Sequence, residues 1–499
     1  MSTATYGGDE VSALVFDIGS STSKVGYAGE DTPKAVFPSW VGYPATNGVE
    51  AMDVDEPAPA SGSGGLVGEG GSGDGADAPT PDVVAAKKDR RQKPLRYVGE
   101  TELYPWKPNV ELKNPLKDCV GMSVRVYGQT HIKVMRLANE AATESGALTP
   151  IRDAFVFLRI VEDWDAYEAL WDHAFARLRV ESSEHPLLLS EPSWNPRESR
   201  EKLIELAFET YDVPCFYLAR SAVLAAFASG RSTALVLDSG GHMTCAVPVV
   251  DGYVLKKALQ KQPYAGNFVS NQALLHLTAQ GINVTPQYLV SNKSAVDAGQ
   301  PPRFDLRERP NTSASYHKLA LDRAVDEFKE TVCHVSETAF NETALNARPV
   351  KNYEFPDGYN NIFGIERFKI TESLFKPSYM LRDSQQPPDG NPAPVSITQL
   401  VQNSIALCDP DLRSQLYPNV VLTGASTLLP GFADRVHHEL LSAAPGFKTK
   451  IQAAGQTTER RFSPWIGGSI LASLGTFHQM WVSKEEYAEI GVNVEKRLH

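Results

Sequence analysis

Two similar stretches decide the fold: Ala13-Leu-Val-Phe-Asp-Ile-Gly-Ser-Ser-Thr-Ser-Lys24 and Thr233-Ala-Leu-Val-Leu-Asp-Ser-Gly-Gly241. In each, a short apolar run leads into an aspartate, which is followed by glycine and hydroxyl residues. The apolar runs predict buried strands over Ser12–Phe16 and Thr233–Leu237. Because the two stretches lie far apart in the chain, the pattern predicts two halves that each give one loop to a shared cleft.

The turn after each predicted strand has the composition of a phosphate-binding loop. Glycine lets the backbone approach a phosphate and point N–H groups at it, serine hydroxyls add donors, and Lys24 adds positive charge. We expect Asp17 and Asp238 to hold Mg²⁺, directly or through its water shell. Either loop alone is more often an ordinary turn, whereas the two together predict a nucleotide cleft. No Walker A motif is present to compete with this interpretation.

The composition excludes several classes of protein. The chain has 499 residues, 48 Lys and Arg against 60 Asp and Glu, a net charge of -12 and 42% hydrophobic residues. Its apolar runs are far shorter than the roughly 20 residues that span a bilayer, and its amino terminus lacks a secretory signal. We therefore expect a soluble intracellular protein without membrane contact. Five widely spaced cysteines argue against disulfides and zinc. The acidic balance disfavours direct DNA binding and favours basic partners.

The rest of the chain alternates short β-rich and helical runs, which is typical of α/β proteins. The acidic, then Gly/Ser-rich segment Asn47–Lys93 predicts a disordered loop. Its basic end has two open interpretations, a nuclear localisation signal or a solvated loop end. Surface loops are also expected at Arg303–Ser315 and Asp383–Pro394. Helices are expected at Asp165–Leu178, Pro196–Thr210 (with Asn195 as N-cap), Tyr316–Ser336, Ile397–Ser404 and Gly431–Ala443.

Long stretches of the chain resemble actin and actin-related proteins. ALVFDIGSSTSKVGYAGEDTPKAVFPS (Ala13 to Ser39) resembles their beginning, Arg200 to Gly241 their central connector, and Glu459 to Tyr487 their carboxyl end. The segment VVLTGASTLLPGFADR (Val420 to Arg435) is also similar. The resemblance implies an actin-like α/β ATPase fold, with duplicated ribonuclease H-like halves and two lobes of two subdomains around a nucleotide cleft. The implied subdomains are 1–38 with 160–222 and 466–499 (subdomain 1), 39–159 (subdomain 2, including 47–93), 223–264 with 371–465 (subdomain 3), and 265–370 (subdomain 4).

Within this family, three segments are similar to the nuclear actin-related protein 4 class. They are Tyr6 to Ser20, Tyr353 to Phe375 and the ending GTFHQMWVSKEEY, and the long insertion after the first loop also fits. This resemblance implies a nuclear subunit of chromatin-remodelling and histone acetyltransferase complexes, with roles in transcription regulation and DNA repair. It implies pairing with actin on a helical, helicase–SANT-associated segment of a scaffold protein, contacts with other complex subunits, and binding to histones or nucleosomes.

The resemblance also implies ATP as the ligand, with Mg²⁺ as a possible companion. Among the implied positions, Ser21 replaces a usual glycine and Arg461 replaces a lysine. Without the resemblance, Lys329 and Glu330 read as an ordinary solvated helix face. The implied cofactor-binding residues are Asp17, Gly19, Ser20, Ser21, Lys24, Asp238, Ser239, Gly240, Gly241, His242, Lys329, Glu330, Gly424, Ala425, Ser426 and Arg461, with Asp17 and Asp238 as the metal ligands.

The positions that carry hydrolysis in actins are changed. Ser221 stands where a glutamine orients the attacking water, Gly241 replaces an aspartate, and Cys245 replaces a histidine. His242 replaces a glycine, and its ring either crowds the γ-phosphate or donates to it. A serine is too short to place that water, a thiol is a weak donor, and lost positioning costs orders of magnitude in phosphoryl transfer. Our hypothesis is that no catalytic residue remains and that ATP is a structural ligand that stabilises the closed lobes.

Three functional hypotheses follow. The first is the non-polymerising nuclear subunit, since the insertion 47–93 lies where actin carries the short loop that docks in its filament. The main alternative is a polymerising cytoskeletal actin-like ATPase, which the residues at 221, 241 and 245 disfavour. The third is a sugar or acetate kinase of the same fold, which needs a substrate pocket with a catalytic carboxylate.

Overall fold

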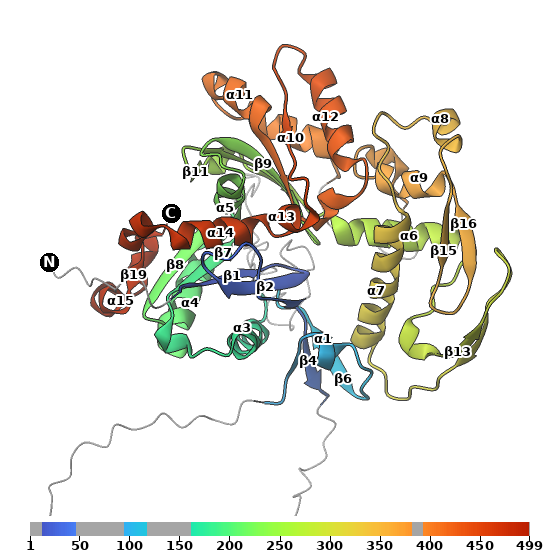
Figure 1. Cartoon of the computed structure of the whole chain (residues 1–499), viewed down its shortest axis with the longest axis horizontal. Helices are drawn as coiled ribbons and strands as arrows, with labels where there is room; N and C mark the ends of the chain where they lie inside the picture. Colours follow the sequence, from blue (N-terminus) through green and yellow to red (C-terminus); the bar gives the residue numbers. More distant parts are fainter. Residues whose placement is uncertain (1–11, 46–93, 117–160, 382–392, 499) are drawn as a thin grey trace, which may run out of the picture.

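The computed structural model describes residues 12–45, 94–116, 161–381 and 393–498, which form two lobes around a central cleft (Figure 1). Each lobe is built on a mixed six-stranded sheet flanked by helices, and smaller β structures extend both lobes. The protein is therefore an α/β protein, as predicted. The segments 47–93 and 383–392, both expected to be loops, lie outside the described residues.

The sheet of the first lobe has the strand order β19-β8-β7-β1-β2-β3. The central strands β1, β7 and β8 are buried at every position, as expected for parallel neighbours covered on both faces. The indole N–H of Trp465 donates to the Val15 carbonyl at 2.9 Å and fixes α14 to the sheet. The elements are β1 (Leu14–Ile18), β2 (Thr22–Tyr27), β3 (Ala35–Pro38), β7 (Leu187–Glu191), β8 (Cys215–Arg220), β19 (Val482–Ser483), α3 (Trp164–Leu178), α4 (Arg197–Glu205), α14 (Ser463–Ser473) and α15 (Lys484–Ile490).

The sheet of the second lobe repeats the start of the first. β9 runs antiparallel to β10 and parallel to β17, as β1 runs antiparallel to β2 and parallel to β7. Asp17 pairs with Lys24 across the first hairpin, and Asp238 pairs with Cys245 across the second. The two predicted halves are therefore confirmed at their hairpins. The elements are β9 (Ala234–Ser239), β10 (Thr244–Val250), β11 (Tyr253–Val254), β12 (Gln260–Gln262), β17 (Val420–Thr423), β18 (Ile451–Gln452), α10 (Ile397–Ala406), α11 (Pro410–Leu416), α12 (Phe432–Ala443) and α13 (Thr457–Arg461).

A smaller β structure extends each lobe. The first lobe carries a three-stranded sheet in the order β5-β4-β6 with the short helix α1, and the second carries two hairpins and several helices. The elements are β4 (Val41–Pro44), β5 (Tyr97–Val98), α1 (Glu100–Leu103), β6 (Val110–Lys113), α6 (Gly266–Ala279), β13 (Val290–Ser294), β14 (Arg303–Leu306), α7 (Ala314–Val332), α8 (Glu342–Asn346), β15 (Lys351–Glu354), β16 (Asn360–Phe363) and α9 (Glu366–Glu372). The predicted subdomain boundaries remain predictions.

The chain passes between the lobes along two helices in close contact. α5 (Ser221–Ala228) joins β8 to β9, and α14 leads back from the second lobe to β19. A Cβ atom at Gly467 in α14 would lie 1.9 Å from the Leu224 carbonyl oxygen in α5. Only glycine allows the two helix backbones to approach so closely.

Several predicted boundaries are corrected. The strands run on through their aspartates to Ile18 and Ser239. The loop expected at 303–315 is confirmed only over 307–313, because β14 pairs with β13 before it and α7 starts at Ala314, where Ser313 caps the helix by accepting from the Tyr316 amide. This helix ends at Val332 rather than at the predicted Ser336. α4 starts at Arg197 rather than Pro196, and the side chain of Asn195 donates to Glu191 at 2.9 Å instead of capping the helix.

Four cysteines of the described ranges, Cys215, Cys245, Cys333 and Cys408, are buried and free. No helix within the described ranges is long and apolar enough to span a membrane.

Candidate functional site

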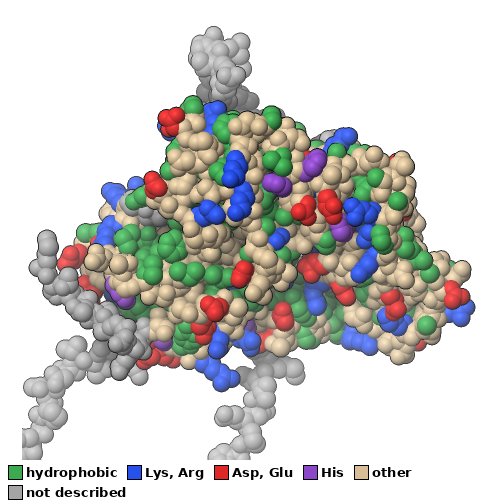
Figure 2. Space-filling model, turned by 45° about the horizontal axis from the view of Figure 1, so that its top comes forward, with side chains coloured by type: hydrophobic (Ala, Val, Ile, Leu, Met, Phe, Trp, Pro, Cys, Tyr) green, Lys and Arg blue, Asp and Glu red, His purple; other side chains and the backbone are tan. Residues whose placement is uncertain are grey.

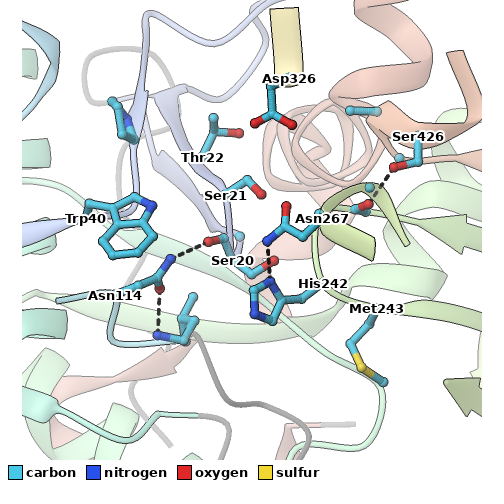
Figure 3. Close-up of a pocket in the computed structure, with 18 of the residues that line it drawn as sticks. Ser20, Ser21, Thr22, Trp40, Asn114, His242, Met243, Asn267, Asp326 and Ser426 are labelled. Atoms are coloured by element: carbon cyan, nitrogen blue, oxygen red, sulfur yellow. Dashed lines mark hydrogen bonds between the residues drawn. The ribbon is translucent and has the colours of Figure 1, made fainter. Parts of the chain in front are cut away.

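A cavity of about 1020 Å³ lies between the lobes and is lined by residues from both. Figure 3 shows Ser20 and Ser21 of the first hairpin turn beside His242 and Asn267 of the second lobe. Of the sixteen residues predicted to bind the cofactor, the lining includes all but Ser239. The hydroxyl of Ser239 is instead fully buried and shares a 2.8 Å hydrogen bond with Thr244.

The first loop is the tight turn between β1 and β2. The Gly19 amide donates to the Thr22 carbonyl at 3.2 Å, and a Cβ atom at Gly19 would lie 3.0 Å from that oxygen and 3.2 Å from Lys24 Nζ. Lys24 Nζ also lies 3.0 Å from Asp17 Oδ2. Glycine at position 19 therefore lets the turn close around the lysine, and the loop brings a cation, hydroxyls and backbone amides to the cleft.

The second loop is held against the start of α6. The Gly266 amide donates to the Gly240 carbonyl at 3.0 Å, and the Asn267 amide donates to the Gly241 carbonyl at 2.7 Å. Ser426 Oγ also donates to the Gly240 carbonyl, at 2.7 Å. These three bonds satisfy the carbonyls of Gly240 and Gly241, use the first two amides of α6 as donors, and fix the second loop against that helix.

The two loops meet at Ser21 and Gly241. A Cβ atom at Gly241 would lie 1.9 Å from Ser21 Oγ and 3.1 Å from Ser21 Cβ. The Ser21 side chain therefore occupies the space that a side chain at position 241 would need. The two departures from the actin pattern, a serine for a glycine and a glycine for an aspartate, are complementary in space.

Asp17 and Asp238 lie at the ends of the two central strands and line the cavity. Burial, with the neighbouring Asp17 carboxylate, raises the pKa of Asp238 to about 6, while Lys24 acts in the opposite direction. Two neighbouring carboxylates form a set of hard oxygen donors that suits Mg²⁺, which keeps most of its water ligands. No group of three or more His, Cys, Asp or Glu residues arranged for a metal occurs in the described ranges. The pair therefore fits a water-shelled ion better than a fully protein-bound one.

The far end of the cavity has the residues predicted for adenosine: Lys329, Glu330, Gly424, Ala425, Ser426 and Arg461. Lys329 Nζ donates to Asp326 Oδ1 at 2.6 Å and to Ser270 Oγ at 2.8 Å. A Cβ atom at Gly424, where φ is +92°, would lie 2.3 Å from the Ser239 carbonyl oxygen. Gly424 thus lets the loop after β17 pack directly on the end of β9.

The three positions implied to have lost catalysis lie in different surroundings. Ser221, the first residue of α5, lines the cavity. Cys245 is 4% exposed and is absent from the cavity wall, and burial with the nearby Asp238 raises the pKa of its thiol well above the usual value. The thiol is therefore neutral at physiological pH. Gly241 lies against Ser21, as described above. Beside it, Asn267 Nδ2 and His242 Nδ1 are 2.7 Å apart, which positions the imidazole next to the second loop.

Sequence reasoning missed several residues that shape the site. Asn114, directly after β6, donates from Nδ2 to the Ser20 carbonyl at 2.7 Å and accepts from the Leu116 amide at 2.9 Å. Asp326 and Ser270 hold Lys329, and Asn267 joins α6 to the second loop. No local motif marks these residues, because their roles depend on how the folded chain places them around the cleft.

Comparison with known proteins matches this arrangement to one family. The actin family model matches residues 8–499. "Actin-related protein 4" of Emericella nidulans is 40% identical over 526 residues, covering 99% of this chain and 98% of that protein. The proteins of the same name from Arabidopsis thaliana and Yarrowia lipolytica are 37% and 36% identical, each covering 99% of this chain and 99% and 97% of their own length.

Proposed function

The chain belongs to the actin family and is similar along its length to proteins named actin-related protein 4; from this premise we propose that it is a nuclear, non-polymerising subunit of chromatin-remodelling and histone acetyltransferase complexes, with ATP as a structural ligand. The observation that carries the nucleotide part is the meeting of two glycine-hydroxyl loops, from two alike hairpins, in one cavity of about 1020 Å³. Nucleotide binding is also what membership of the family suggests.

In the proposed mechanism, the nucleotide joins the lobes. Lys24, the loop hydroxyls and the amides of both loops bind the phosphates, and the cluster around Lys329 binds the ribose and base. Asp17 and Asp238 would hold Mg²⁺, which supplies charge neutralisation to the phosphates when bound. Since ligand contacts come from both lobes, binding favours the closed arrangement by mass action.

Hydrolysis is proposed to be weak or absent. Ser221 reaches less far into the cleft than a glutamine, and the neutral Cys245 thiol is buried away from the cavity. Neither Ser221 nor Cys245 therefore provides a side chain that could position the attacking water, as phosphoryl transfer needs.

The partner part of the proposal has support from an exposed apolar surface beside α5 and α14. Phe227, Ile470, Leu474 and Met480 are each 37–43% exposed, although they are large and apolar. Figure 2 shows that apolar side chains also gather on part of the molecular surface, whereas charged side chains are scattered over the rest of the visible face. Such a surface suits the apolar side of a helix, in keeping with pairing beside actin on a helical scaffold segment. Histone contact is proposed from the net charge of -12.

The first experiment identifies the nucleotide. The purified protein is held for several hours at working temperature and denatured, and the released nucleotide is separated by chromatography. If the released nucleotide is mostly ATP, the result supports the proposal, and if it is mostly ADP, the result favours the alternative, a polymerising ATPase. If no nucleotide is released, the nucleotide part of the proposal is wrong.

Sedimentation of the pure protein at physiological salt tests polymerisation, since a pelleted polymer would contradict the proposal that the protein does not polymerise. Co-purification from nuclear extract with actin and a remodeller scaffold tests the partners and the localisation.

A further inference from the structure

Arg220 is an almost buried arginine that uses few of its hydrogen-bond donors. It is the last residue of β8 and is 6% exposed. Its Nη1 donates to the Ser193 carbonyl at 2.9 Å, which is the one hydrogen bond of this guanidinium within the described ranges. A guanidinium has five N–H donors and stays charged. Solvent still reaches its other nitrogens, since none of them is among the fully enclosed atoms that lack a partner. Arg220 therefore presents a cation with free donors to a ligand from outside.

The nearby Arg200 is an arginine of similar burial that is well paired. It is 4% exposed, and its Nε lies 3.0 Å from Glu191 Oε1. Its other nitrogens donate to Glu495 and to the Leu498 carbonyl. The two carboxylates thus serve Arg200, and no carboxylate of the described ranges forms an ion pair with Arg220. Because a nearly buried cation without a counterion is costly, the contrast indicates that Arg220 is suited to bind an anion.

Lys256 adds a second cation to this place. It is exposed and follows β11 in the chain. The Arg220 charge, followed by burial and by the Arg200 charge, lowers the pKa of Lys256, whereas Glu495 and Glu191 act in the opposite direction. The positive charges therefore outweigh the two carboxylates at this position. Lys256 itself forms no ion pair in the part of the chain that the structure describes. Two neighbouring cations that repel each other form a place where an anion is stabilised.

These two cations lie at one end of the exposed apolar surface beside α5 and α14. α5 starts directly after Arg220 and carries Phe227 near its other end. β11 contacts α5, and Tyr253 of β11 is 65% exposed (Figure 1). With a rise of about 1.5 Å per residue, the helix spans about 10 Å between positions 220 and 227. A partner segment that covers the apolar surface therefore comes within reach of Arg220 and Lys256.

We propose that Arg220 and Lys256 form a carboxylate-binding site, and that an Asp or Glu side chain of the partner protein occupies it. The planar guanidinium binds a carboxylate through two parallel N–H···O bonds, and the Lys256 ammonium adds a third donor from the rim. The identity of the partner rests on the proposed function, whereas the site itself rests on the unpaired cations. On a helical partner, the acidic residue lies about seven positions from the apolar residue that contacts Phe227.

Thermal melting of the free full-length protein separates a binding role of Arg220 from a structural one. Arg220→Gln removes the charge and keeps an amide N–H for the Ser193 carbonyl. Arg200→Gln is the matched control, because this arginine is equally buried but already paired. Arg220→Gln should melt at or above the wild-type temperature, whereas Arg200→Gln should melt lower because it leaves Glu191 buried without its partner. An equal loss in both variants would show that Arg220 is structural and would overturn the inference.

The site can be probed without a partner, with acetate as the carboxylate and phosphate as the inorganic anion. Each sodium salt is titrated into the full chain, against sodium chloride of the same ionic strength. Acetate should raise the melting temperature of the wild type, and Arg220→Gln should lose most of this rise. Lys351→Gln, at an exposed lysine of β15, should respond like the wild type. An equal response of wild type and Arg220→Gln to acetate, or a response of this site to phosphate alone, would contradict a carboxylate site.

The complex purified from nuclear extract tests the occupant. A carbodiimide joins a lysine to a carboxylate in direct contact, so mass spectrometry should find Lys256 linked to an Asp or Glu of a co-purifying protein. Arg220→Gln should dissociate from the complex about 30-fold faster or more, and Lys256→Gln about two- to fivefold faster. Links from Lys256 only to carboxylates of this chain, or an unchanged dissociation rate in Arg220→Gln, would refute the proposed occupant. Recovery of no partner would instead count against the proposed function, and the acetate titration would still decide the site.

Discussion

The contact between Ser21 and Gly241 makes a sharp prediction about the cleft. Gly241→Ala would place a carbon 1.9 Å from Ser21 Oγ and 3.1 Å from Ser21 Cβ. Rotation of the Ser21 hydroxyl relieves the first contact, but the second persists unless the two loops move apart. Overfilling a packed site costs about 1–3 kcal/mol. If this cost falls on the closed, ligand-bound state, nucleotide affinity falls by about 5- to 150-fold.

A double-mutant cycle tests the spatial origin of the loss. Ser21→Gly removes both of the atoms that the methyl group added at position 241 would touch, so the double variant should recover most of the affinity that Gly241→Ala loses. The expected coupling energy is about 1–2 kcal/mol, and the cycle subtracts what Ser21→Gly loses by itself. Gly446→Ala is the control, since no atom lies within 4 Å of a Cβ added there.

The assay is titration with a fluorescent ATP analogue, with thermal melting of the nucleotide-free variants alongside. Wild-type affinity in Gly241→Ala would show that the loops have room for the methyl group. Strictly additive effects in the cycle would show that the two residues do not share the space. Either result would refute the reasoning.

Two other predictions concern charge. The pKa of Asp238 is raised to about 6, above its ordinary value near 4, so the folded nucleotide-free protein binds this proton more tightly than the unfolded chain does. The free energy of unfolding should therefore fall as the pH rises from about 4 to 6, by up to about 3 kcal/mol. The Asp238→Asn variant should lack this fall and should melt at a higher temperature than the wild type at about pH 7.5. Identical pH profiles of the two proteins in thermal melts would contradict the prediction. Arg435 and Glu372, 2% and 1% exposed, form two hydrogen bonds of 2.9 and 2.7 Å. Arg435→Met leaves the carboxylate buried and should cost about 3–5 kcal/mol in urea unfolding, whereas Arg348→Met at an exposed pair should change little; equal effects would count against a role for burial.

The parts of the fold that the sequence predicts are those fixed by local chemistry. The strands β1 and β9 follow from continuous apolar runs, and the turns after them follow from their glycine and hydroxyl residues. The errors lie where a tertiary contact overrides a local signal. The sequence predicts Asn195 as a helix cap, but its side-chain amide donates instead to Glu191 Oε2 at 2.9 Å. Segment 303–315 looks like a loop because it is rich in polar residues, yet backbone pairing with β13 makes part of it a strand.

The residues of the cleft likewise fall into those that the sequence predicts and those that only the folded structure reveals. Both phosphate loops are local motifs, and the resemblance adds the positions around adenosine. The sequence does not predict Asn114 and Asp326. Asn114 donates to the Ser20 carbonyl and Asp326 accepts from Lys329, and both contacts form only in the folded chain.

The Ser21–Gly241 contact also relates two of the positions at which this chain departs from the actin pattern. By sequence, Ser21, Gly241 and Ser221 are three separate departures from actin. In the structure, the first two occupy one space, so an aspartate restored at 241 would meet Ser21 before it met a substrate. Return to a hydrolytic site would then require a change at 21 before the change at 241 became tolerable, and a longer side chain at 221 besides. The need for changes in both loops is in keeping with the proposal that hydrolysis is weak or absent.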